Sequence, residues 1–343
     1  MARLAGIRSR ATIVITLALG LALAGAGCGG AGTSTSSSSA AAAHRGTPHK
    51  GSAPAGAVRL AYRPLFSLRA PLRDPASAAL GGGRFVLLGG LDSADTSSDG
   101  IEMASLRGLL PGSTTLPLAQ HDAQGAALDG KVYVFGGGSL SELDHIVSFD
   151  PARRTIQTVG TLPRAQSDVA VTSSGGTAYV AGGYDGTSWL NTIIAWRPGS
   201  SPRVVGHLPV GLRYAAASAV DGQIMIVGGS TPSGASTAIY SFDPGSGRVR
   251  QIGRLPHPVT HAGAATLGST VYLVGGRGDS LDAQTADVWA IDPSSGAVHA
   301  AGRLPQALSD TGVLSVGNVI VVAGGLSRAG TVAGVGELVA RSG

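Results

Sequence analysis

The sequence predicts an all-β protein, a six-bladed β-propeller of four-stranded antiparallel blades. First, an apolar segment that ends in two glycines occurs six times in the 343 residues. Second, the first glycines of successive pairs are 47, 46, 46, 47 and 49 residues apart, a spacing typical of propeller blades. Third, the chain has 54 glycines but only 13% charged residues, which favours short strands and turns over helices. The six pairs are Gly89-Gly90, Gly136-Gly137, Gly182-Gly183, Gly228-Gly229, Gly275-Gly276 and Gly324-Gly325.

Residues 1–27 have the pattern of an export signal. Three arginines precede an apolar run over residues 11–23, and small residues follow it. The run is too short to favour a permanent membrane span. The only cysteine, Cys28, comes next.

The segment before Cys28 resembles a bacterial lipobox, in which the cysteine thiol carries a diacylglyceryl group. The lipobox prefers leucine three residues before the cysteine, where this chain has Gly25. The resemblance implies lipidation of Cys28; the alternative is an incidental thiol in a discarded signal. We expect an exported protein, anchored by lipid to the outer face of the bacterial cytoplasmic membrane.

Residues 28–57 are rich in Ser, Ala and Gly. Such a stretch cannot bury enough apolar area to fold, so we expect a flexible linker. Removal of the signal lowers the net charge from +5 to +2, and no basic run interleaved with aromatics occurs, so nucleic acid is not expected as a partner. No second cysteine is present for a disulfide.

The second copy of the repeat shows how one blade is built. After Leu116-Pro117, a strand of small residues is expected over residues 122–128. Asp129-Gly130 supplies the positive backbone angles of a tight hairpin turn. The second strand, residues 131–135, leads into the glycine pair.

Two more strands complete this copy. A polar loop leads to a third strand over residues 146–149, which ends at Asp150-Pro151, where proline fixes one angle of the turn. The fourth strand, residues 155–159, leads to the next Leu-Pro pair. The second strand is apolar at consecutive positions, as expected when both faces of a sheet are covered. The first strand is rich in Ala and Gly, as the innermost strand of a propeller should be. The glycine pair is expected at a bulge or a close backbone approach.

This order of features resembles the kelch repeat over roughly residues 58–343. The features are Leu-Pro, an inner strand, a second strand ending in Gly-Gly, a loop, and an aromatic-Asp-Pro turn such as Phe149-Asp150-Pro151. The tryptophan usual in the kelch fourth strand is missing, and the first and last copies lack the aromatic-Asp-Pro turn.

The two ends of the repeat region predict how the ring closes. After Gly325 only residues 336–340 remain as a third strand, and nothing is left for a fourth. Residues 60–68 have no inner strands of their own. We expect this N-terminal segment to supply the outer strand of the last blade.

Aligning the copies at the inner strand predicts a ring of polar residues at one mouth of the central channel. The ring is Asp74, Asp122, Asp168, Tyr214, His261 and Asp310, and the residues before it are Arg73, His121, Ser167, Arg213, Thr260 and Ser309. The loops after the glycine pairs emerge on the same face and contribute Asp92, Asp95, Tyr184, Asp185, Trp189, Arg277, Asp279 and Arg328.

Two interpretations of the ring remain open. Its carboxylates either accept hydrogen bonds from a sugar or an amine, with Arg73 and Arg213 binding an anion, or cap backbone N–H groups at the blade junctions. Tyr214 and His261 break the pattern and are the better functional candidates, although such residues are commonly just packed. Trp189 either contacts a ligand or packs against its own blade.

We predict an extracytoplasmic scaffold that binds a glycan or a protein partner through this face. The alternative is a sugar-modifying enzyme such as a sialic-acid-type epimerase, because bacterial epimerases of this kind resemble the chain in fold and blade number. Their reaction needs a base and an acid on either side of a sugar carbon, and the sequence selects no such pair. Kelch-type copper radical oxidases need a cysteine cross-linked to tyrosine, which Cys28 cannot supply. No zinc-like His spacing, serine nucleophile elbow or phosphate loop is present, so no cofactor is expected. The four ring Asp residues could hold an oxygen-ligand cation, but they lack the local spacing of a calcium loop.

Overall fold

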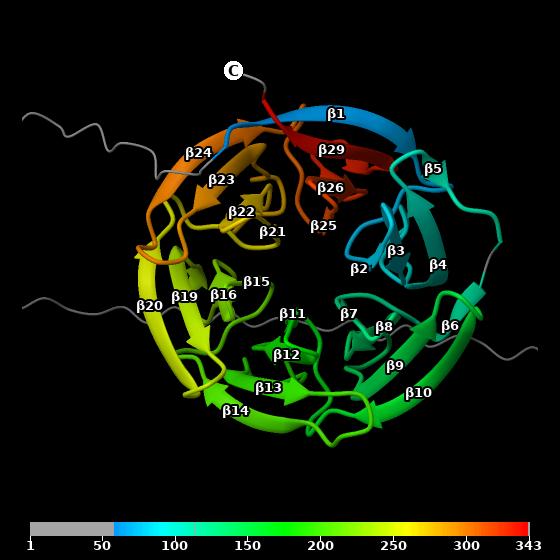
Figure 1. The fold of residues 1–343 in the computed structure, drawn as a ribbon, viewed down its shortest axis with the longest axis horizontal. Coiled ribbons are helices and arrows are strands. Elements are labelled where there is room, and N and C mark those ends of the chain that lie inside the picture. The colour runs from blue at the N-terminus through cyan, green and yellow to red at the C-terminus, as the bar shows by residue number, and fades with distance from the viewer. Residues whose placement is uncertain (1–57, 113, 342–343) are drawn as a thin grey trace, which may run out of the picture. The chain divides into compact units, whose positions relative to one another are not determined.

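The computed structural model describes residues 58–112 and 114–341, and these form six sheets around a central axis (Figure 1). Each sheet has four principal strands, with the innermost given first below. Blade 1 consists of β2 (Ala76–Gly81), β3 (Arg84–Leu88), β4 (Ser98–Ser105) and β6 (Thr114–Gln120), and the short β5 (Gly108–Leu109) also pairs with β4. Blade 2 consists of β7 (Gln124–Leu128), β8 (Lys131–Phe135), β9 (His145–Asp150) and β10 (Thr155–Thr161).

The remaining blades repeat this order. Blade 3 consists of β11 (Ala170–Ser174), β12 (Thr177–Ala181), β13 (Thr192–Trp196) and β14 (Arg203–His207). Blade 4 consists of β15 (Ala216–Val220), β16 (Gln223–Val227), β19 (Ala238–Asp243) and β20 (Arg248–Arg254). Blade 5 consists of β21 (Gly263–Leu267), β22 (Thr270–Val274), β23 (Asp287–Ile291) and β24 (Val298–Arg303).

Blade 6 combines both ends of the described chain. It consists of β25 (Gly312–Val316), β26 (Val319–Ala323), β29 (Gly334–Ala340) and β1 (Leu60–Ser67). β1 is antiparallel to β29, with Leu60 opposite Ala340 and Ser67 opposite Gly334. The predicted closure of the ring by an N-terminal outer strand is therefore confirmed, and Figure 1 shows β1 lying outside β29.

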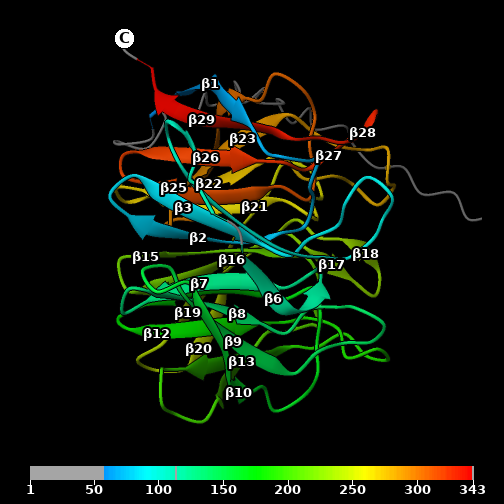
Figure 2. The ribbon, with the colours of Figure 1, turned by 90° about the vertical axis from the view of Figure 1, so that its right-hand side faces the viewer.

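Two small hairpins lie in loops after the glycine pairs. They are β17 (Ser230–Thr231) with β18 (Gly234–Ala235), and β27 (Leu326–Ser327) with β28 (Gly330–Thr331). Both project from the same face of the ring (Figure 2). We call this the loop face.

The core lies between blades. Alternate residues of β8 point to opposite faces of its sheet: Val132 and Val134 pack in a cluster with blade 1, whereas Tyr133 and Phe135 pack with blade 3. The consecutive apolar residues of each second strand are explained by this two-sided burial. The leucines of the five Leu-Pro pairs that precede blades 2 to 6 are also buried: Leu116, Leu162, Leu208, Leu255 and Leu304.

The glycine pairs join each blade to the next. Gly182 has φ 66°, and a Cβ there would collide with the carbonyl oxygen of Leu212, at the entry to blade 4. The N–H of Gly183 donates to that same carbonyl, at 2.8 Å. All six pairs make this second bond, to Gln120, Gln166, Leu212, Val259, Leu308 and Leu72 in turn. The expected close backbone approach is confirmed.

The predicted turns are also present. Asp129 and Gly130 have φ 50° and 76°, as a tight hairpin turn between β7 and β8 requires. At the Asp-Pro turn of blade 2, the Asp150 carboxylate accepts a hydrogen bond from the Ala152 N–H at 3.0 Å. The inner strand of blade 2 is shorter than predicted, because Asp122 has φ 54° and cannot continue a strand.

The export signal, Cys28 and the linker lie outside the described residues. Within the part of the chain that the structure describes, no helix is long and apolar enough to cross a membrane.

Candidate functional site

The six ring residues share one backbone conformation, which brings them together at the loop-face end of the channel. Their φ angles lie between 49° and 60°, in the left-handed region. The N–H of each of five members donates to the carbonyl of the member before it; for example, Tyr214 donates to Asp168 at 3.0 Å and His261 to Tyr214 at 3.1 Å. The alignment of the repeats therefore identified a real ring. Its members are Asp74, Asp122, Asp168, Tyr214, His261 and Asp310.

The four carboxyls of the ring form two pairs. Asp74 shares a side-chain hydrogen bond with Asp310, and Asp122 shares one with Asp168. Burial, followed by the charges of neighbouring carboxylates, raises the pKa of Asp74 and of Asp122 well above the ordinary value of 3.8. Burial also raises the pKa of Asp310. Two carboxyls that share a site retain a proton at a pH where an isolated Asp is ionised, so each pair contains both a proton donor and a proton acceptor.

The carboxyls do not cap the blade junctions as one interpretation expected. Tyr214 Oη donates to Asp122 at 3.2 Å, Arg213 donates to Asp168, and Ser309 donates to Asp310. Among the described residues, no hydrogen bond joins a ring carboxylate to a backbone N–H. It is the left-handed backbone that joins the blades at these positions, and the side chains are directed to one another.

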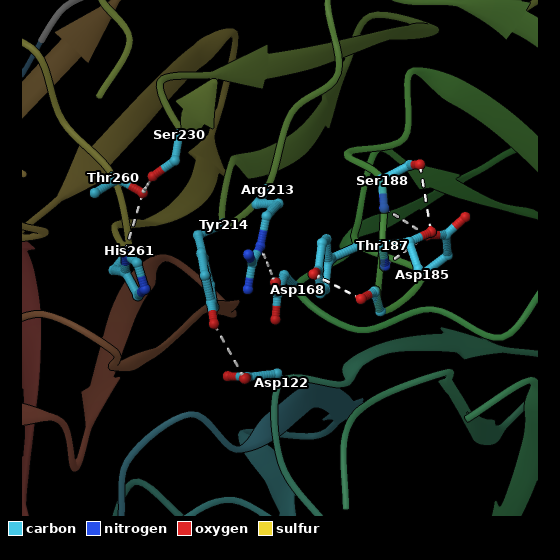
Figure 3. A network of polar contacts seen from close by, with 12 residues as sticks. Asp122, Asp168, Asp185, Thr187, Ser188, Arg213, Tyr214, Ser230, Thr260 and His261 are labelled. Carbon is cyan, nitrogen blue, oxygen red and sulfur yellow. Dashed lines mark hydrogen bonds and ion pairs between the residues drawn. The ribbon is translucent and has the colours of Figure 1, made fainter. Parts of the chain in front are cut away.

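Tyr214 and His261 are stacked. Their ring centroids are 3.7 Å apart and their planes differ by 23°. Figure 3 shows the phenol extending from its own blade toward Asp122, with the imidazole of His261 beside it. Burial, followed by the nearby carboxylates, raises the pKa of Tyr214, so the phenol is a hydrogen-bond donor at neutral pH.

His261 is neutral, and its tautomer follows from its partners. Arg277 Nη2 lies 3.0 Å from Nε2 of His261. Because a guanidinium only donates, Nε2 accepts this hydrogen bond and the proton of the neutral imidazole is on Nδ1. Nδ1 then donates to Thr260 Oγ1 at 3.0 Å, and Thr260 contacts Ser230 Oγ at 2.8 Å. Burial, followed by the nearby arginines, lowers the pKa of His261 to about 2. We therefore assign His261 the role of positioning Arg277, not of exchanging a proton with a ligand.

Three arginines surround the mouth. Arg213 donates to Asp168, and its guanidinium carbon lies 4.1 Å from the ring centroid of Tyr184, 5.4 Å from Trp189 and 5.2 Å from Tyr214. Burial acts to lower the pKa of Arg213, but the Asp168 carboxylate outweighs it and the net shift is upward. The Arg213 side chain remains 23% exposed. The three aromatic rings therefore hold the guanidinium in place without covering it.

The other two arginines have donors to spare. Arg73 donates to Asp95 at 2.7 Å, and Arg277 donates to His261. In both residues Nε is buried and has no hydrogen-bond partner within the described structure. A buried donor without a partner is costly, so an anion that accepted from these groups would be stabilised.

The remaining predicted residues have local roles. His121 contacts Ser97 Oγ at 2.8 Å and lies 3.7 Å from Asp122, and burial lowers its pKa. The carboxylate of Asp185 accepts from the N–H groups of Thr187 and Ser188 and pairs with Arg164, whose hydrogen bond lowers the pKa of Asp185. Asp92 accepts from two amides of its own loop. Asp279 accepts from the N–H of Ala235, and Arg328 donates to a carbonyl of the neighbouring loop. The contacts of Asp92, Asp185, Asp279 and Arg328 lie within one loop or join neighbouring segments, and none involves a ring residue.

The sequence did not identify some residues that line the site. Gln124 and Thr311 face the cavity at the ring, and Ser97 orients His121. Gln124 comes two residues after the ring residue Asp122, and Thr311 directly follows Asp310, so the alignment of the repeats could have indicated both. Ser97 is far from any ring residue in sequence, so the alignment gives no signal for it.

Two cavities lie along the axis. A small one of about 50 Å³ is lined by the six ring residues. A second, of about 290 Å³, lies between the inner strands and is lined by Ala, Gly, Ser, Thr, Val and Leu side chains and Gln124. Within residues 58–112 and 114–341, no group of three or more His, Cys, Asp or Glu is arranged to hold a metal ion.

No protein-family model matches the sequence, and no curated protein matches it. A solved structure titled "Structure of YjhT" is similar, with a TM-score of 0.69 over 80% of this chain and 96% of that one, at 15% sequence identity. The chain is a propeller similar in fold to YjhT. At this identity the likeness concerns the fold alone.

Proposed function

We propose that the channel mouth binds a small acidic sugar and catalyses an epimerase-type proton transfer on it. One observation carries this proposal: two proton-sharing carboxyl pairs and three arginines, Arg73, Arg213 and Arg277, surround the same mouth. Guanidinium groups are suited to bind a sugar carboxylate. The resemblance in fold and blade number to the sialic acid epimerases of bacterial envelopes makes an acidic sugar the ligand class to test.

The chemistry needs one acid and one base. In a cyclic sugar with a free anomeric hydroxyl, an ionised carboxylate of one pair accepts the hydroxyl proton while a protonated carboxyl donates to the ring oxygen. The bond between the anomeric carbon and the ring oxygen breaks, and closure onto the other face of the carbonyl returns both protons. The raised pKa of Asp122 keeps a carboxyl protonated for this role. Tyr214 Oη, which donates to Asp122 at 3.2 Å, stabilises the ionised form once the proton has left.

This proposal is tested by NMR with N-acetylneuraminate. The crystalline sugar is a single anomer, so dissolving it with the full chain and following the anomeric signals gives the rate of interconversion. Wild type should accelerate it, and Asp122→Asn should reduce the acceleration by about 100-fold or more, because one acid–base group typically supplies that much. Asp129→Asn, on the exposed turn between β7 and β8, is the matched control and should keep the full rate.

A binding scaffold without turnover is the second candidate. Leu140 and Leu281 are exposed on loops of the loop face, in blades 2 and 5. Exposed apolar side chains around a polar centre fit a macromolecular partner. Binding of the sugar without faster anomer exchange would favour this candidate over the enzyme.

A further inference from the structure

The phenol of Tyr214 spans the mouth between blades that are not neighbours. Tyr214 belongs to the entry of blade 4, yet its hydroxyl reaches Asp122 of blade 2, 92 residues earlier, while its ring is stacked on His261 of blade 5. The side chain therefore contacts blades on both sides of its own. Figure 3 shows it projecting inward, away from its own ribbon.

Tyr214 occupies a backbone conformation that suits it poorly. Its φ is 51°, and four of the other five ring positions place Asp there, a residue that tolerates the left-handed region. A bulky residue rarely adopts this backbone conformation, because its Cβ crowds the neighbouring carbonyl. The stack on His261 and the bond to Asp122 offset the cost of this crowding and hold the phenol in one orientation.

The two axial cavities are adjacent, and Tyr214 lines the smaller one. The cavity at the ring and the larger channel share the lining residues Gln124, Ala215, Ala262 and Thr311. Only about 50 Å³ is open at the ring, compared with about 290 Å³ in the channel. The smaller cavity is the one that the six ring side chains line, and the phenol is the largest of these side chains.

Some of the channel's hydroxyls already join inner strands of neighbouring blades. Ser218 contacts Thr266 at 2.7 Å, Ser173 donates to the Ala127 carbonyl at 3.3 Å, and Ser315 donates to the Thr266 carbonyl at 2.7 Å. These groups stabilise the channel wall and are not free to bind a ligand.

We propose that Tyr214 closes the axial channel and forms the floor of the mouth site, so that it determines the size of the ligand. A ligand then enters from the loop face, rests against the Tyr214–His261 stack and does not extend into the channel. That the ligand is an acidic sugar rests on the proposed function, whereas the closure itself does not.

Thiol labelling tests the closure without any ligand. In a full chain carrying Cys28→Ser, Thr311→Cys introduces a single thiol just below the ring, at a residue that lines both cavities. Tyr214→Asn removes the phenol but keeps a residue that tolerates the left-handed backbone, and Tyr214→Phe keeps the ring. With N-ethylmaleimide as the probe, labelling in the Asn variant should be faster by about tenfold or more, since a closed thiol waits for local opening.

The Phe variant should label nearly as slowly as the tyrosine protein, because the aromatic ring and its stack remain. Circular dichroism melts establish that all three proteins are folded. If the thiol is labelled as fast with Tyr214 as with Asn, or if all variants label equally slowly, Tyr214 does not close the channel and the proposal is wrong.

Ligand selectivity tests the size limit. Calorimetry with N-acetylneuraminate and its α2→8-linked dimer should show Tyr214→Asn shifting preference toward the dimer by about tenfold. Tyr184→Ala, which removes an aromatic ring from beside Arg213, should weaken both ligands equally. An unchanged ratio in the Asn variant would overturn the size limit. If neither sugar binds any of these proteins, the proposed function fails, and the labelling result decides the closure by itself.

Discussion

At the channel mouth, the left-handed backbone of the ring residues determines where their side chains can go. Each ring residue lies two residues before its inner strand, and its side chain lines the cavity at the mouth. Four Asp side chains placed in this way must lie close together. The result is two carboxyl pairs in which the pKa of Asp74, Asp122 and Asp310 is raised, an arrangement typical of groups that exchange protons.

The buried carboxyls predict a pH dependence of stability. Because the pKa of Asp122 is higher in the folded chain than its ordinary value of 3.8, the folded state retains a proton that the unfolded state has lost. The contribution of this proton to the free energy of unfolding is fully present below the ordinary pKa of Asp, and it is lost as the pH rises through the pKa of Asp122 in the folded chain. Asp122→Asn cannot ionise, so its melting temperature should rise relative to wild type by about 2 °C or more between pH 4 and pH 7.

Melts in a series of buffers check this prediction. Asp129→Asn is the control, because Asp129 has a similar φ of 50° but lies on an exposed turn. Parallel melting curves for Asp122→Asn and wild type across this pH range would show that Asp122 titrates as in the unfolded chain.

The residues of the site could largely be predicted from the sequence, but the contacts between their side chains could not. The repeat register identified every ring member. Two such contacts are Arg277 with His261 and Tyr214 with Asp122, which is 92 residues earlier. They depend on how far each blade is rotated about the axis. A linear alignment contains no such information.

Among the structural elements, the glycine pair after each second strand is the most constrained. Both glycines have positive φ, and the second donates its N–H to the entry of the next blade. The pair thus ends a strand, turns the chain onto the loop face and holds two blades together. The sequence indicated a close approach here, because six glycine pairs recur at one place in the repeat.

Two glycine substitutions separate backbone strain from collision. In Gly182→Ala the new Cβ meets the Leu212 carbonyl oxygen, whereas in Gly175→Ala, at φ 56°, nothing lies within 4 Å. The control should cost about 1 kcal/mol from the left-handed backbone alone. Gly182→Ala should cost at least about 2 kcal/mol more, because the junction between blades 3 and 4 must open.

Urea unfolding of both variants gives these two free energies. Equal losses would mean that the glycine pairs are needed only for their backbone angles, and the role of the close approach in joining blades would be withdrawn.

At the scale of the whole molecule, the ring is closed by a strand from the other end of the described chain. The sequence predicted this because the last copy lacked a fourth strand while an N-terminal segment lacked partners. It did not predict the irregular first blade, where β4 pairs with both β5 and β6. That blade has no Asp-Pro turn, and its longer connection between the third and fourth strands follows no repeat pattern.

β1 is held by more than its pairing with β29. Leu60 and Leu68 are buried, Tyr62 packs over Gly336, and Tyr272 Oη bonds the backbone of Val58 at 3.1 and 3.2 Å. Deleting residues 58–68 should therefore lower the melting temperature by many degrees, since the two apolar side chains alone are worth roughly 3–6 kcal/mol. An unchanged melt would contradict the closure.

Moving β1 to the other end of the chain distinguishes the two reasons why the deletion variant could be unstable: a failure to fold, and the loss of the strand that closes the ring. Leu60 lies opposite Ala340, so residues 58–68 can be attached after Arg341 through a two-residue Asn-Gly turn, and the chain can begin at Arg69. Blade 6 then becomes a four-stranded meander like its neighbours, and the melting temperature should return to within about 5 °C of wild type. If the permuted chain melts as low as the deletion, the continuous connection from β1 to β2, and not the strand itself, stabilises the ring.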